Sequence, residues 1–189
     1  MIRTAIITGA MLMTMSVPAQ EAQGNIVTVN GMEMYYEVSG QGDPLIVLHG
    51  AYMNIPAMGT IVPRLAESHT VYALEFQGHG RTADIDRPIT YPHLASDVAA
   101  FMDALSIEKA DVFGYSMGAA AGLRLAIDYP EKVDQLIAAS VAYDASGWQT
   151  AFTAFIPQMA PEMFVGTAME DEWKSSHPTP KASGRWSRS

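Results

Sequence analysis

The stretch Gly114-Tyr115-Ser116-Met117-Gly118 decides the fold, because it places a serine where a strand pattern changes into a helix pattern. Residues 111–115 are strand-like, and residues 117–129 have helical spacing. A serine on such a sharp turn has strained backbone geometry, and glycines two positions away on either side let the strand and the helix approach closely. The motif alone is weak, and a structural Gly/Ser turn is the alternative. Its context predicts that Ser116 is a nucleophile held above the edge of a sheet.

Other strand patterns lie on both sides of this turn. A wholly apolar run, which is typical of a strand covered on both faces, occurs at residues 45–48, and further strand patterns that are mostly apolar occur at 71–75 and 135–139. An Asn30-Gly31 pair between two strand-like runs, at 26–30 and 32–38, indicates a hairpin.

Helical patterns separate these strands. Residues 58–67 have helical spacing, and a second helix follows a loop at 77–92, with Asp97 and Asp103 off its apolar face. That face is formed by Leu94, Val98, Phe101, Met102 and Leu105. The alternation predicts an α/β fold with a mostly parallel sheet, right-handed crossovers and flanking helices.

A second motif, His49-Gly50, follows the apolar run at 45–48. A loop leaving that strand can supply the backbone N–H of Ala51 as an oxyanion donor, together with the N–H of Met117. His49 could serve as a general base, but we favour a structural role in which its ring braces the loop.

The third motif is Gly-His-Gly at 78–80, directly after a strand pattern. A Gly-x-Gly loop could bind phosphate, but the full dinucleotide-binding spacing is missing, and the sequence contains no Gly-Lys-Ser/Thr phosphate loop. We interpret this segment as a tight structural turn.

Together, Leu-His-Gly at 48–50, Gly-His-Gly-Arg-Thr at 78–82 and the serine motif at 114–118 resemble the α/β-hydrolase superfamily. Within it, the sequence is similar to the esterase, enol-lactonase and C–C hydrolase group. The resemblance covers residues 26–145. It implies an eight-stranded sheet, a lid after the sixth strand, a cofactor-free Ser–His–Asp triad and a small acyl substrate such as a carboxylic ester or lactone. Serine rather than aspartate at 116 argues against the dehalogenase and epoxide-hydrolase branches.

The chain departs from this family after residue 145. The resemblance implies an acid and a histidine well beyond the nucleophile, but only 73 residues follow Ser116. We expect a C-terminally truncated member that lacks the last two strands. Asp144 is a weak candidate for the acid, and His177 is a weaker candidate for the base. An inactive fragment and an acyltransferase therefore remain as alternatives.

Aromatic residues suggest the nature of the substrate. Tyr52 and Tyr115 adjoin the two catalytic motifs, and we expect both to line the substrate pocket. Further aromatic side chains, which suggest an apolar acyl or ring-bearing substrate, are Trp148, Phe152, Phe155, Phe164 and Trp173.

The two ends of the chain differ from its core in composition. Arg3 precedes an apolar run, from Ala5 to Val17, that is shorter than the roughly 20 residues of a membrane span. This pattern predicts a cleaved export signal, a periplasmic or secreted protein, and no stable membrane insertion after cleavage. The predicted division is a signal at 1–19, a hydrolase core at 20–145, the start of a lid or cap at 146–174 and a disordered tail at 175–189.

Charge and cysteine content exclude several classes of function. Twenty Asp and Glu residues against eleven Lys and Arg give a formal charge of −9, which disfavours nucleic-acid partners. The chain has no cysteine, so disulfides, thiolate zinc sites and a cysteine nucleophile are excluded. We expect neither a metal nor a cofactor, and the oligomeric state cannot be read from the sequence.

Overall fold

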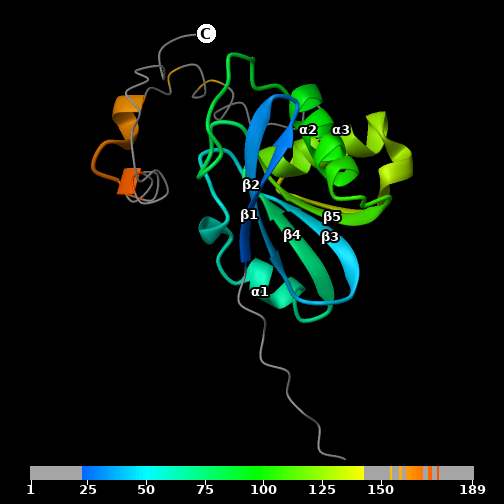
Figure 1. The fold of residues 1–189 in the computed structure, drawn as a ribbon. Helices are drawn as coiled ribbons and strands as arrows, with labels where there is room; N and C mark the ends of the chain where they lie inside the picture. Colours follow the sequence, from blue (N-terminus) through cyan, green and yellow to red (C-terminus); the bar gives the residue numbers. More distant parts are fainter. Residues whose placement is uncertain are drawn as a thin grey trace, which may run out of the picture.

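The computed structural model describes residues 23–142, 154, 158, 161–167, 170, 171 and 174 (Figure 1). Its six strands are β1 (Gln23–Val29), β2 (Met32–Ser39), β3 (Asp43–Leu48), β4 (His69–Leu74), β5 (Ala110–Tyr115) and β6 (Val133–Ala139). They form one sheet in the order β1-β2-β4-β3-β5-β6. The strands β4, β3, β5 and β6 are parallel, while β2 pairs antiparallel with both β1 and β4. The predicted α/β fold with a mostly parallel sheet is confirmed.

The hairpin at the start of the sheet is also confirmed. Asn30 and Gly31 have φ angles of 48° and 79°. Positive φ at both central residues is what a tight two-residue hairpin turn requires. The strand β1 begins at Gln23, earlier than the apolar run indicates, because its first polar residues pair with the end of β2 at the edge of the sheet.

The longer helices are α2 (Tyr91–Ala104) and α3 (Met117–Asp128), which pack against each other (Figure 1). The segment predicted as one helix over 58–67 is instead a short turn, η1 (Pro56–Met58), followed by α1 (Ile61–Leu65). Gly59 separates them with a φ of 57°, which a helix cannot accommodate. Two further short turns are η2 (Pro130–Lys132) and η5 (Pro161–Phe164).

Strand β3 shows why the sheet is covered on both faces. Ile46 and Leu48 point into a core shared with α2 and α3, whereas Leu45 and Val47 point into a second core with α1. Since successive side chains of a strand alternate between the two faces, a wholly apolar strand needs cover on both sides. The carboxyl end of β3 is thereby fixed beside that of β5, where the serine motif lies.

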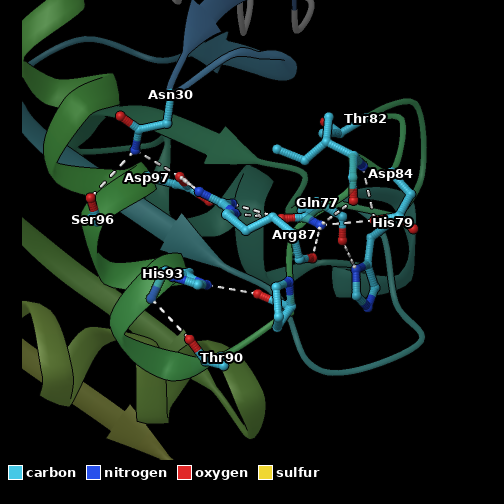
Figure 2. Close-up of polar contacts among 12 residues, drawn as sticks. Asn30, Gln77, His79, Thr82, Asp84, Arg87, Thr90, His93, Ser96 and Asp97 are labelled. Atoms are coloured by element: carbon cyan, nitrogen blue, oxygen red, sulfur yellow. Dashed lines mark hydrogen bonds and ion pairs between the residues drawn. The ribbon is translucent and has the colours of Figure 1, made fainter. Parts of the chain in front are cut away.

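Asp97 corrects one sequence prediction. It is fully buried rather than lying off the packed face of α2. Arg87 binds its carboxylate at 2.5 Å, and the side-chain amide of Asn30 donates to it at 2.8 Å. Figure 2 shows Arg87 extended between Asp97 and Gln77, whose Oε1 accepts from Arg87 Nη2 at 2.7 Å. This network ties the loop before α2 to the hairpin turn, and it offsets the cost of burying the charge.

In the described part of the chain, β6 pairs only with β5, as expected for an edge strand. Its Ile137 is 58% exposed. Across the described residues, no helix has both the length and the apolar character needed to cross a bilayer.

Candidate active site

Ser116 lies between the last residue of β5 and the first residue of α3. Its φ of 51° and ψ of −113° lie outside the regions that non-glycine residues normally adopt. Such strain persists only where the surrounding structure holds it in place, and it is concentrated at functional sites. Here the Ser116 amide donates to the carbonyl of Ala139 in β6 at 2.9 Å, which fixes the turn against the neighbouring strand.

The two glycines of the motif are packed too tightly for any side chain. A Cβ on Gly114 would lie 2.5 Å from the carbonyl oxygen of Gly118. A Cβ on Gly118 would lie 2.3 Å from the carbonyl oxygen of Leu48 and 2.6 Å from that of His49. The helix α3 therefore starts in direct contact with the backbone of both β5 and β3.

The loop after β3 lies against Ser116. A Cβ on Gly50 would be 3.4 Å from the Cβ of Ser116 and 3.1 Å from a ring carbon of Tyr115. The next residue is Ala51, and the first amide of α3 is that of Met117. The first amides of a helix have no acceptor within the helix, and the helix dipole favours negative charge beside them. The structure thus places the loop that contains Ala51 beside the turn that precedes Met117, and the amides of these two residues are the proposed oxyanion donors.

His49 is buried and held by backbone groups on both sides of its ring. Its Nε2 accepts a hydrogen bond from the amide of Phe76 at 3.1 Å. Its Nδ1 must then carry the proton, which it donates to the carbonyl of Gly50 at 2.7 Å. Burial, and secondarily the nearby ring of His79, lowers the pKa of His49 to about 3. A neutral ring with both nitrogens occupied fits a brace for the loop better than a base for Ser116.

The two tyrosines lie at the rim of this site. Tyr52 follows Ala51, is 45% exposed and has a φ of 60°. Its ring lies 5.3 Å, centroid to centroid, from that of Phe164 in η5. Tyr115 is 37% exposed and borders Gly50. Both residues are therefore partly accessible to solvent.

The remaining predicted residues lie outside this geometry. Asp144 and His177 lie outside the described residues, as do residues 1–19 and 175–189 and most of 146–174. Among the described residues, no histidine is hydrogen-bonded to the Ser116 hydroxyl. His69 is bonded to the carbonyl of Leu65, and the other histidines away from the turn have partners in their own segments. Within the same residues, no cluster of potential metal ligands is present.

Glu75, which the sequence patterns did not single out, is fully buried directly after β4. Arg81 binds it through Nη2 at 2.6 Å and through Nε at 3.0 Å. Burial alone would lower the pKa of Arg81, but the hydrogen bond and the charge of Glu75 outweigh it and raise that pKa. A usable signal was present, since an acid directly follows an apolar strand and an arginine follows six residues later.

A strained serine between a parallel strand and a helix, with a glycine loop from the adjacent strand against it, is the geometry typical of the nucleophile turn in α/β hydrolases. The model of the family described as the alpha/beta hydrolase fold matches residues 43–166. The chain belongs to this family.

Individual relatives have different activities. The chain is 34% identical over 106 residues to the dihydrolipoyllysine-residue acetyltransferase component of the acetoin cleaving system of Cupriavidus necator. The matched segment covers 56% of this chain and 28% of that protein. It is 28% identical over 99 residues to the esterase YbfF of Escherichia coli, and this match covers 52% of this chain and 39% of the esterase. The structure of the epoxide hydrolase VrEH1 from Vigna radiata matches with a TM-score of 0.62 and 25% identity, and this match covers 66% of this chain and 40% of the epoxide hydrolase. The chain thus spans two fifths or less of the length of these three proteins.

Proposed function

We propose that the chain carries the nucleophile of a serine hydrolase that acts on a carboxylic ester, a lactone or a related acyl substrate. The observation that carries this proposal is the backbone strain at Ser116, with a φ of 51° where the loop after β3 contacts it. This strain holds the side chain on a turn directly before the first amides of α3.

In the proposed reaction, the Ser116 oxygen attacks the carbonyl carbon while its proton passes to a base. The carbonyl π electrons move onto the oxygen, and the amides of Ala51 and Met117 stabilise that oxyanion. The tetrahedral intermediate then collapses, the alcohol leaves with the proton, and water hydrolyses the acyl-serine to regenerate the hydroxyl. A serine needs such a base, and a histidine oriented by an acid is the usual one. We place both partners outside the described residues, with Asp144 as a candidate for the acid.

The substrate we propose has an apolar acyl group or ring. Tyr115 has a partly exposed ring beside Gly50, Tyr52 is partly exposed two residues further along the same loop, and the Phe164 ring lies next to that of Tyr52. The relative named as an esterase supports ester substrates, whereas the relative named as an epoxide hydrolase shares the fold. Serine at position 116 favours acyl chemistry, because it forms an acyl ester with the substrate.

An acyltransferase is the second candidate. The Cupriavidus necator relative, an acetyltransferase component, supports it. The same acyl-serine would then be resolved by an alcohol or another acceptor instead of water. A catalytically inactive chain is the remaining alternative, since no histidine among the described residues is hydrogen-bonded to the Ser116 hydroxyl.

A turnover assay separates these candidates. Purified protein is incubated with p-nitrophenyl acetate, alone and with a series of alcohols, beside Ser116→Ala and the control Ser106→Ala, which changes a serine that also has a positive φ but lies away from the site. Hydrolysis that disappears only in Ser116→Ala supports the hydrolase. Ester formation that outpaces hydrolysis supports the transferase, and equal rates in all three proteins contradict both.

We further propose that residues 1–19 direct export. Their single positive charge before an apolar run supports this. The site as proposed requires a small acyl molecule as its partner, and it requires no cofactor.

A further inference from the structure

Two hydrogen bonds tie the ends of the loop after β3 to the segment that follows β4. At the first end, the amide of Phe76 donates to His49 Nε2 at 3.1 Å. At the second end, the amide of Ile55 donates to the carboxylate of Glu75 at 3.2 Å. Between these ties lie residues 50–54, which include Ala51.

The carboxylate of Glu75 is wholly enclosed and uses both oxygens. Oε1 accepts from Ile55 N and from Arg81 Nη2, the latter at 2.6 Å. Oε2 accepts from the backbone amide of Arg81 at 2.5 Å and from its Nε at 3.0 Å. A Cβ on Gly80 would lie 2.2 Å from Oε2, so this loop can wrap the carboxylate only with glycine there. A buried carboxylate with four donors has little freedom to move.

Arg81 is in turn fixed to the antiparallel part of the sheet. Its Nη1 donates to Glu37 at 2.9 Å and to the hydroxyl of Tyr35 at 2.8 Å. Its guanidinium also lies 3.7 Å from the centre of the Tyr35 ring. The position of Glu75 is therefore set by β2 and β4, and through Ile55 it reaches the loop beside the nucleophile.

The tethered loop contains a strained residue. Tyr52 has a φ of 60°, which an aromatic residue adopts only when its surroundings impose it. A loop with one end released would relax this angle and move the preceding amide, that of Ala51. A small displacement of an oxyanion donor is costly, because its stabilisation depends on its distance to the developing charge.

We propose that Glu75 is a positioning residue that holds the amide of Ala51 in place for the oxyanion of an acyl substrate at Ser116. This assignment rests on the proposed function, because it presumes that Ala51 serves as an oxyanion donor. Glu75 itself touches neither substrate nor nucleophile.

The test replaces Glu75 by Gln in the full chain. An amide group has one acceptor oxygen, so the variant can satisfy the donors at only one of the two oxygen positions. Glu37→Gln is the first control, because it also removes a carboxylate from Arg81 but does not touch Ile55. Asp97→Asn is the second control, because it alters a buried carboxylate–arginine pair in another part of the fold.

Two quantities are measured on each variant. The first is the hydrogen exchange of the Ile55 amide and of amides 50–54, relative to amides within β3. We expect exchange to accelerate about tenfold or more in Glu75→Gln alone, as loss of a hydrogen bond to a charged group predicts. The second is the kinetics with p-nitrophenyl acetate. We expect kcat to fall about tenfold with KM retained, less than the roughly hundredfold loss when a whole donor is removed.

Unchanged exchange, equal acceleration in the two controls, or unchanged kcat would overturn the proposal. Should Glu75→Gln not fold, Glu75→Asp keeps the charge for Arg81 but withdraws the carboxylate by one methylene, and the same results are expected. If the wild-type chain has no Ser116-dependent turnover, the proposed function fails. The exchange measurement then still decides whether Glu75 orders the loop.

Discussion

The backbone amide of Phe76 donates to Nε2 of His49 over 3.1 Å, and this bond requires a neutral imidazole. It joins the residue directly after β3 to the segment that follows β4. The loop after β3 and the loop after β4 are therefore linked through the imidazole of His49, a residue that is 1% exposed.

This relationship predicts a pH-dependent loss of stability. Burial lowers the pKa of His49 in the folded chain to about 3, whereas an unfolded histidine has a pKa near 6.5. Above pH 6.5 the ring is neutral in both states, so His49 contributes no pH dependence there. As the pH falls from 6.5 towards 3, only the unfolded state gains the proton, and the free energy of unfolding falls by up to about 1.4 kcal/mol per pH unit.

Urea denaturation of the wild type and of His49→Gln at pH 7 and pH 5 measures this loss in the free energy of unfolding. The stability advantage of the wild type over the variant should be smaller at pH 5, because the variant lacks the titrating group. His69→Gln, which removes a partly exposed histidine, is the matched control. If the difference in the free energy of unfolding between the wild type and His49→Gln is the same at both pH values, this prediction is wrong.

Gly118→Ala tests the close contact of α3 with β3. The added Cβ would lie 2.3 Å from the Leu48 carbonyl oxygen, and backbone cannot yield as a side chain can. We expect a loss of about 1–3 kcal/mol in the free energy of unfolding, measured by urea denaturation. Gly122→Ala in the same helix is the matched control, because its Cβ would meet only the flexible side chains of Leu136 and Val112 within 3.4 Å. Equal losses in both variants would argue against the contact.

Arg87→Met should be severely destabilising. It leaves the fully buried carboxylate of Asp97 without its positive partner, at a cost of about 3–5 kcal/mol. Lys109→Met is the control, because its pair with Asp134 is exposed and should contribute less than about 1 kcal/mol. Chemical denaturation of the two variants distinguishes a buried pair from a surface pair, and similar small losses would count against this network.

The predicted export signal has a direct test. Expression of the full chain in a bacterial host should give a mature protein that begins near Gln20, found outside the cytoplasm. Intact-mass measurement of the purified protein and of a variant with Arg3→Glu checks this. A full-length mass in the cytoplasmic fraction for the unmodified chain would refute the prediction.

The fold could be predicted from local patterns. Each apolar strand of the parallel sheet is short and continuous, and Asn30-Gly31 encodes the hairpin turn without any tertiary information. The position of Ser116 between a strand and a helix was predictable for the same reason, since the strand and helix patterns directly flank the motif. The overlong helix prediction at 58–67 failed because one glycine at a positive φ outweighed helical spacing.

The buried charges could not be predicted from periodicity. Asp97 was expected off the packed face, because a lone carboxylate is costly to bury. Its partner Arg87 is ten residues away in a loop, and only the folded chain brings the two together. Glu75 was missed for a similar reason, since its contact with Ile55 crosses from one loop to another.

Covalent labelling of Ser116 tests the central claim most directly. The protein is treated with a fluorophosphonate, digested, and analysed by mass spectrometry to locate the adduct. The account predicts a phosphonyl group on the Ser116 hydroxyl, with no labelling of Ser116→Ala. A folded, soluble wild-type protein that remains unlabelled, or that carries the adduct on another residue, would contradict it.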